Sequence, residues 1–125
     1  MSEALKGVVV CHGPLATALV DATEQISGIT GALVPVSNTG CDRELIERRL
    51  GDAVGDGPAV VFVDMPSGSC SFAALHRYRT HQSVRVVTGV NLAMLVDFVF
   101  HRTLSAGDAA ARAAATGANA IRQAG

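Results

Sequence analysis

His12 and Asp64 are the two side chains of this sequence whose types and positions best suit a chemical step. Each follows a short apolar run: His12 comes after Gly7–Val10 and Cys11, and Asp64 comes directly after Ala59–Val63. A carboxylate that accepts a hydrogen bond from one ring nitrogen of a histidine fixes the tautomer and leaves the other nitrogen as a nucleophile. Taken alone, His12 also fits a loop histidine without a role, and Asp64 also fits a turn or helix cap.

Small polar residues beside this pair are candidates for binding a phosphoryl group. The glycine after His12 precedes a proline, a residue that commonly starts helices, so we expect the imidazole beside a helix N-terminus and its partial positive charge. The loop after Asp64 offers hydroxyl and backbone N–H groups that suit phosphate oxygens, although serine and glycine also form ordinary turns. The phosphate-binding candidates are Gly13, Ser67, Gly68 and Ser69.

Neither a cofactor nor a metal is expected. The sequence contains no G-x-G-x-x-G after its first apolar run and no G-x-x-x-x-G-K-[ST], so nucleotide binding lacks support. The three cysteines, Cys11, Cys41 and Cys70, are odd in number and widely spaced. We interpret them as reduced thiols and not as a disulfide or zinc framework.

The elements that would position His12 and Asp64 are short strands alternating with helices. The first and third apolar runs lack polar residues, as in strands buried on both faces of a parallel sheet. Pro35 and Arg85 place the second and fourth runs nearer the edges. The predicted strands are Gly7–Val10, Ala32–Val36, Ala59–Val63 and Val84–Val87.

Helical periodicity fills the intervals between these strands. Gly28 is expected to stop the first helix, and Asp42 and Ser105 are expected to cap the second and the last. Asn91 fits either a cap of the fourth helix or a ligand contact. The helices are predicted near residues 15–26, 43–54, 71–79, 91–99 and 106–123.

This pattern predicts the α/β class: an open, mainly parallel four-stranded sheet with helices on both faces, a flavodoxin-like three-layer sandwich. The common strand order 2-1-3-4 opens a crevice between the first and third strands, where His12 and Asp64 would face each other. The 125 residues are interpreted as a single domain spanning 1–125.

Composition excludes several classes of protein. The formal net charge is −1, which argues against a sequence-independent nucleic-acid binder. No apolar run reaches the length of a membrane span, and residues 1–6 lack the hydrophobic region of a signal peptide. The interpretation of the three cysteines as reduced thiols leads us to expect a cytoplasmic protein.

Three motifs together resemble the enzyme IIA family of the mannose-type (mannose/fructose/sorbose) phosphoenolpyruvate-dependent sugar phosphotransferase system. The first surrounds His12, the second is an aspartate followed by a glycine- and serine-rich loop and a helix, and the third has the pattern G-V-N-x-x-M-L. In this sequence they read Cys11–Ala16, Asp64–Ala74 and Gly89–Leu95. Two departures lie in the second motif, where Ser67-Gly68 replaces a glycine pair and Cys70-Ser71 replaces proline and phenylalanine.

The resemblance implies a role for each matched position. His12 would be phosphorylated by the phosphocarrier HPr and would pass the group to an enzyme IIB partner. Asp64 would orient the imidazole, and Ser69 would lie near the phosphoryl group. The family acts without metal or nucleotide, forms dimers, and meets the membrane only indirectly, through transporter components.

Two other functions fit the same residues. A regulatory phosphoprotein would use the same chemistry at His12 without serving sugar transport. A small-ligand-binding module of flavodoxin-like shape would use the same crevice without phosphoryl transfer. Nothing in the sequence identifies a sugar.

Overall fold

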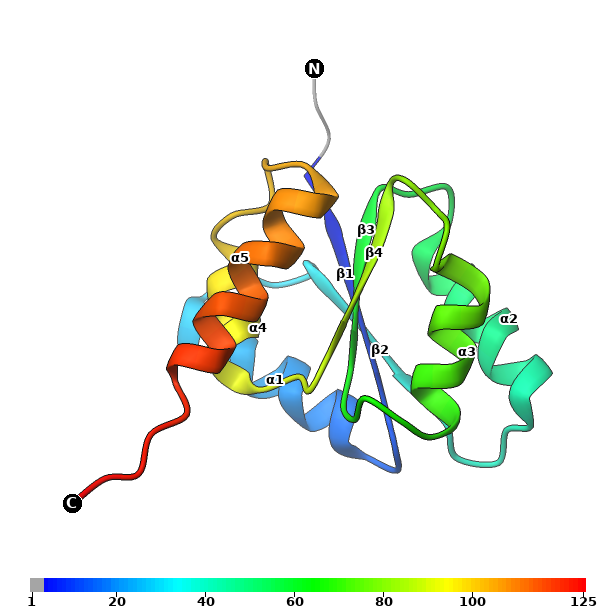
Figure 1. Ribbon diagram of the computed structural model, residues 1–125, viewed down its shortest axis with the longest axis horizontal. Helices are drawn as coiled ribbons and strands as arrows, with labels where there is room; N and C mark the ends of the chain where they lie inside the picture. Colours follow the sequence, from blue (N-terminus) through cyan, green and yellow to red (C-terminus); the bar gives the residue numbers. More distant parts are fainter. Residues whose placement is uncertain (1–3) are drawn as a thin grey trace.

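Four short runs rich in valine form the central sheet of the computed structural model, which describes residues 4–125 (Figure 1). The strands are β1 (Lys6–Cys11), β2 (Leu33–Ser37), β3 (Ala59–Val63) and β4 (Val84–Thr88). All three pairings are parallel, and the strand order is β2-β1-β3-β4. The predicted α/β fold and the predicted order 2-1-3-4 are therefore confirmed.

The chemistry of the strands explains which of them lie inside the sheet. Every residue of β3 is buried, because both faces of this strand are covered. Pro35, which has no N–H group to donate to a neighbouring strand, is exposed on the edge strand β2. Arg85 is likewise exposed on β4, at the other edge.

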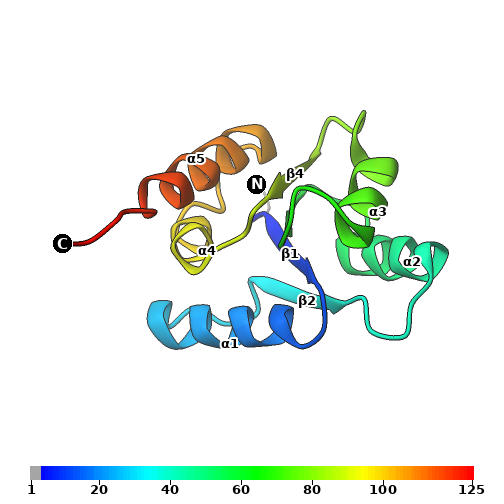
Figure 2. The same ribbon diagram turned by 60° about the horizontal axis from the view of Figure 1, so that its bottom comes forward.

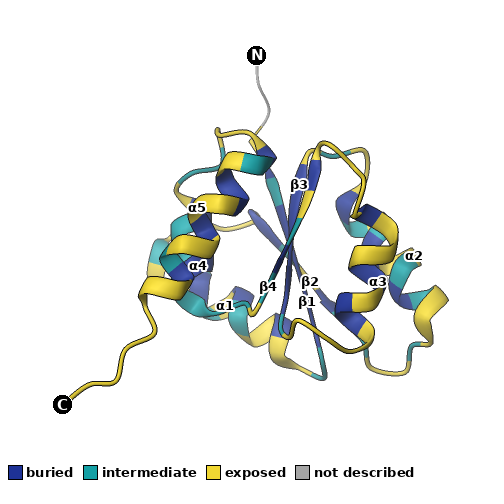
Figure 3. Cartoon of the chain, in the orientation of Figure 1, coloured by how far each residue is buried: buried dark blue, intermediate teal, exposed yellow. Residues whose placement is uncertain are grey.

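Helices cover both faces of the sheet, as Figures 1 and 2 show from two directions. One face carries α1 (Leu15–Ser27), α4 (Leu92–Val99) and α5 (Ala106–Asn119). The other face carries α2 (Arg43–Val54) and α3 (Ser69–Tyr78). Figure 3 shows that the helix sides turned to the sheet are buried and the opposite sides exposed. The result is the predicted three-layer sandwich.

Successive side chains of β1 point to opposite faces of the sheet, and each face has its own part of the hydrophobic core. Val9 and Cys11 pack on the side of α1, α4 and α5, whereas Val8 and Val10 pack on the side of α2 and α3. On the first side Phe62 meets Phe98 edge to face, with ring centroids 5.1 Å apart.

Side-chain caps set most helix starts as expected. Asp42 accepts a hydrogen bond from Leu45 N–H, and Ser105 accepts one from Asp108 N–H. The side chain of Asn91 caps α4 by accepting from Met94 N–H, and its amide also donates to the carbonyl of Gly117 in α5. Of the two roles expected for Asn91, a helix cap or a ligand contact, the structure shows the helix cap.

Two predicted helix bounds are wrong. The helix expected from residue 71 begins at Ser69, because Gly68 takes the N-cap position and its carbonyl accepts from Phe72 N–H. The last helix ends at Asn119 and not near Gln123. Residues 121–125 are exposed, so no packing stabilises further helical turns.

Within residues 4–125, every helix is too short or too polar to cross a lipid bilayer.

Candidate active site

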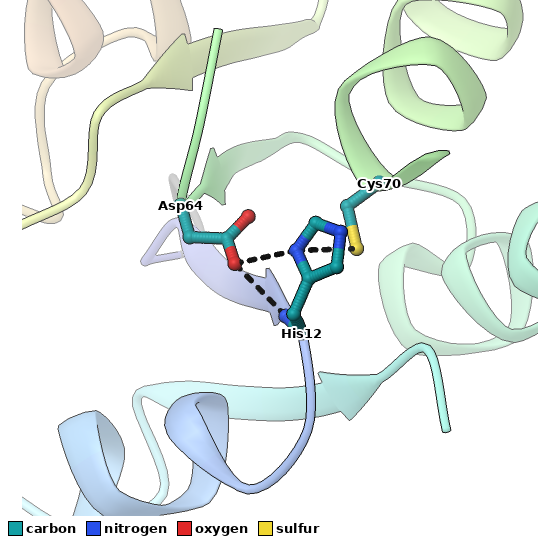
Figure 4. A group of neighbouring side chains, drawn as sticks. All are labelled: His12, Asp64 and Cys70. Atoms are coloured by element: carbon teal, nitrogen blue, oxygen red, sulfur yellow. Dashed lines mark hydrogen bonds and ion pairs between the residues drawn. The ribbon is translucent and has the colours of Figure 1, made fainter. Parts of the chain in front are cut away.

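His12 and Asp64 lie side by side at the carboxyl edge of the sheet. Val10 of β1 pairs with Val63 of β3, so the residues that follow these two strands come out at the same level between them. The Nδ1 atom of His12 lies 2.8 Å from Oδ2 of Asp64 (Figure 4). The two residues are far apart in sequence, and the parallel pairing of β1 with β3 brings them together.

The carboxylate of Asp64 holds both the backbone and the ring of His12. Its Oδ2 accepts from the backbone N–H of His12 at 2.9 Å, and its Oδ1 accepts from the backbone N–H of Met65 at 3.0 Å. Partial burial pushes the pKa of Asp64 upward, but the hydrogen bonds from the backbone and ring of His12 outweigh burial and lower that pKa. Asp64 is therefore ionised at neutral pH and acts as an acceptor towards Nδ1–H.

The Nε2 side of the imidazole lies beside the start of α3. A Cβ atom at Gly68 would lie 3.8 Å from Nε2 and 3.7 Å from Cε1 of His12, so glycine leaves this edge of the ring open. Gly68 also has φ of +103°, a conformation that side chains disfavour. No side chain caps α3, so the N–H groups of its first turn remain available to an anion.

The predicted phosphate-binding residues lie in the turn after His12 and in the segment from the end of β3 to the start of α3. Gly68 is the N-cap of α3 and Ser69 its first residue, so both lie at a helix N-terminus instead of in a separate loop. Ser67 lies exposed just before them. Gly13 has φ of +59° and follows His12 directly.

Asn38, at the end of β2, is a site residue that the sequence analysis missed. Its Oδ1 accepts from Gly13 N–H at 3.1 Å, and its Nδ2 donates to Ser69 Oγ at 3.4 Å. Ser37 strengthens the same connection, because its hydroxyl donates to the carbonyl of Gly13 at 2.7 Å. Asn38 thus links the turn that carries His12 to the first residue of α3. The only sequence signal was its place after the second strand, at the same edge as the other loops.

Cys70, in the first turn of α3, also contacts the imidazole. Its Sγ lies 4.0 Å from Nδ1 of His12 (Figure 4). Burial, followed by the charge of Asp64, raises the pKa of Cys70 to about 11. The same two causes raise the pKa of Cys11 to about 12. Both are thus protonated thiols at neutral pH, which makes them poor nucleophiles.

The remaining histidines lie away from this pair. The Nδ1 atom of His76, an exposed side chain, lies 2.9 Å from Oε1 of Glu47. The Nδ1 atom of His101 lies 2.7 Å from the carbonyl oxygen of Asp97, one turn earlier. His81 is exposed after the end of α3. His101 also has a carboxylate oxygen of Asp97 3.5 Å from Nδ1, but neither His76 nor His101 lies between the ends of the central strands β1 and β3, as His12 does.

The fold and the site define a class of protein: a flavodoxin-like sandwich with a histidine–carboxylate pair between its two central strands. Within that class, the chain belongs to the EIIA-man family, described as the PTS system fructose IIA component, whose sequence model matches residues 6–115. It is therefore a component of a sugar phosphotransferase system. No curated protein sequence matches the chain.

Solved structures with the same fold include other components of such systems. The mannose/sorbose-specific IIA subunit from Enterococcus faecalis is 23% identical, with a TM-score of 0.85 over 98% of this chain and 96% of that one. The component EIIA from Streptococcus agalactiae is 24% identical, with a TM-score of 0.82 over 95% and 96%. A IIA protein associated with the fucose utilization operon of Streptococcus pneumoniae is 21% identical, with a TM-score of 0.79 over 98% and 96%. At these identities the structures support the fold.

Proposed function

We propose that His12 accepts a phosphoryl group on Nε2 from the phosphocarrier HPr and passes it to an enzyme IIB partner. The observation that carries this proposal is the 2.8 Å contact between Nδ1 and the ionised Asp64, which favours a proton on Nδ1 and a lone pair on Nε2. In the step, the bond from phosphorus to the donor breaks as a bond from phosphorus to Nε2 forms. The proton on Nδ1 remains where it is.

Asp64 has two effects on this transfer. Its negative charge stabilises the positive charge that develops on the imidazole as the new P–N bond forms. The same charge disfavours a dianionic phosphoryl group nearby, which keeps the phosphorylated form reactive towards the next acceptor. The free N–H groups at the start of α3 offset that repulsion by binding phosphoryl oxygens. Gly13, Ser67, Gly68 and Ser69 are the residues that we propose to line the phosphate site.

The surroundings of His12 favour a protein partner over a free small molecule. Three exposed apolar side chains follow the central strands: Leu15 at the start of α1, Met65 in the loop after β3 and Phe72 in α3. We call these three side chains the apolar rim. The guanidinium of Arg43 lies 4.3 Å from the ring centroid of Phe72 and adds a positive charge to the rim. A cavity of about 780 Å³, by contrast, lies at the opposite end of the sheet, lined by residues such as Leu5 and Pro58. This function places the protein in the cytoplasm, with membrane contact only through transporter components.

Phosphorylation of His12 can be tested by reconstitution with radiolabelled phosphoenolpyruvate, enzyme I and HPr. His12→Ala should abolish labelling, because the nucleophile is lost. His76→Ala, His81→Ala and His101→Ala are matched controls and should retain the label. The label should be acid-labile and alkali-stable, as a phosphoramidate is, and should leave the protein when enzyme IIB is added. A label that survives in His12→Ala would contradict the proposal, and one that IIB cannot remove would indicate a regulatory role.

Asn38 gives a test of how the site is positioned. Asn38→Ala removes both the acceptor for Gly13 N–H and the donor to Ser69, so the turn carrying His12 and the start of α3 are no longer tied. We expect the initial rate of phosphorylation to fall about tenfold or more, because small displacements of reacting groups are costly. Asn119→Ala, which truncates an exposed amide at the end of α5, is the control. Equal rates for Asn38→Ala and the wild type would show that this link is unimportant.

We also propose that the protein forms a homodimer through a surface away from His12. Ile26 and Phe100 are exposed apolar side chains at the ends of α1 and α4, and Leu104 is exposed a few residues after Phe100, so all three lie toward the edge of the sheet opposite His12. Twofold pairing is the commonest way to cover such a surface.

Light scattering at micromolar concentration should give twice the chain mass of 12.8 kDa. Phe100→Asp should shift the mass towards the monomer, because the 57%-exposed ring would be replaced by a charge. Met65→Asp changes a side chain of similar exposure, 52%, on the apolar rim and should leave the mass unchanged. A monomer mass for the wild type would refute the dimer.

A further inference from the structure

Three potential metal ligands lie close together on the Nδ1 side of the His12 ring. Nδ1 of His12, a carboxylate oxygen of Asp64 and Sγ of Cys70 all lie within 4.8 Å of one another. They come from three segments, the ends of β1 and β3 and the first turn of α3, as Figure 4 shows. The phosphoryl transfer proposed above uses the first two atoms, and it leaves the sulfur of Cys70 without a role.

The donor set selects a particular class of cation. Imidazole nitrogen and thiolate sulfur are ligands of zinc and of other thiophilic divalent ions, whereas magnesium and calcium prefer oxygen alone. Three protein ligands leave one tetrahedral position open, which is the arrangement of zinc sites that exchange a ligand with solvent. The side chain of His12 is 43% exposed and that of Asp64 9%, whereas Cys70 is fully buried, so an ion can reach the sulfur only from the side of His12.

The distances are close to those that a tetrahedral ion requires. Bonds of about 2.1 Å to nitrogen and oxygen and about 2.3 Å to sulfur place nitrogen about 3.4 Å from oxygen and about 3.6 Å from sulfur. The structure has 2.8 Å between Nδ1 and Oδ2 and 4.0 Å between Nδ1 and Sγ. Binding therefore requires the hydrogen bond to open by about 0.6 Å and the sulfur to approach Nδ1 by about 0.4 Å. The carboxylate oxygen and the sulfur, which lie within 4.8 Å of each other, must also close to about 3.6 Å, and rotation of the Asp64 and Cys70 side chains can supply these shifts.

We propose that His12, Asp64 and Cys70 form a binding site for one zinc ion or a similar thiophilic divalent cation, and that the bound ion prevents His12 from accepting a phosphoryl group. The ion replaces the thiol proton of Cys70, which is released to solvent. It also takes the lone pair of Nδ1, so the single proton of the neutral ring moves to Nε2. Nε2 then has no lone pair with which to attack phosphorus.

Binding and its consequence are separable. The metal site depends only on the convergence of the three ligand atoms, whereas the inhibition rests on the proposed phosphorylation of His12. Metal binding and phosphorylation would compete, because the ion needs Nδ1 deprotonated and the transfer needs Nδ1–H held by Asp64.

Cobalt is the probe for binding, because a cobalt–thiolate bond gives a charge-transfer absorption band. Titration of the wild-type protein with Co²⁺ should give this band at one ion per chain, and zinc should displace the cobalt. Cys70→Ser and Cys70→Ala should lose the band and weaken zinc binding in calorimetry about tenfold or more. Cys41→Ser removes another thiol near the same edge and should behave as the wild type. The metal site is refuted if the wild type gives no band, if the Cys70 variants keep it, or if Cys41→Ser loses it.

Inhibition is measured as the ratio of the phosphorylation rates with and without zinc, taken separately for each variant. For the wild type and for Cys41→Ser, the rate with zinc should be about one tenth or less of the rate without zinc. For Cys70→Ala the ratio of the two rates should stay near one. Because this variant lacks the proposed zinc ligand, any decrease in its rate measures the effect of zinc on the donor proteins. Equal ratios for the wild type and Cys70→Ala would overturn the inhibitory role. If zinc binds but His12 is never phosphorylated without it, the proposed function fails and the metal site stands.

Discussion

The hydrogen bond between Asp64 and His12 is the interaction on which the rest of the site depends. One carboxylate oxygen accepts from both the backbone N–H and the ring Nδ1 of His12, so it fixes the position and the orientation of the imidazole together. This contact exists because β1 and β3 are adjacent and parallel, with Val10 paired to Val63. The valine-rich strands buried between two helical layers therefore determine the geometry of the reactive group.

The two ring nitrogens of His12 face different surroundings. Nε2 lies beside Gly68 and the free N–H groups of α3, an environment suited to an anion. Nδ1 faces a carboxylate and a sulfur atom, an environment suited either to a proton or to a thiophilic cation. Which of the two occupies Nδ1 decides whether Nε2 is a nucleophile. The proposed phosphoryl acceptance and the proposed metal binding are thus alternative states of a single imidazole.

Much of this arrangement could be predicted from the sequence because its signals are local. Pro35 and Arg85 indicated the edge strands, and the unbroken apolar run Ala59–Val63 indicated a central one. This strand order placed His12 and Asp64 at the ends of adjacent strands, where they are hydrogen-bonded. The link from Asn38 to Gly13 and Ser69 could not be predicted, since it joins loops that follow different strands. The start of α3 at Ser69 was missed because its N-cap, Gly68, caps through its backbone and not through a side chain.

The tautomer of His12 tests the central claim most directly, and ¹⁵N NMR of the histidine ring measures it in the unphosphorylated, metal-free protein. If Asp64 accepts from Nδ1–H, the neutral ring should carry its proton on Nδ1 and show Nε2 unprotonated. Asp64→Ala removes the oxygen that accepts from both the backbone N–H and Nδ1–H of His12, so the proton is no longer held on Nδ1 and the population with the proton on Nε2 should rise. A wild-type ring with its proton on Nε2, or an unchanged tautomer in Asp64→Ala, would contradict the account.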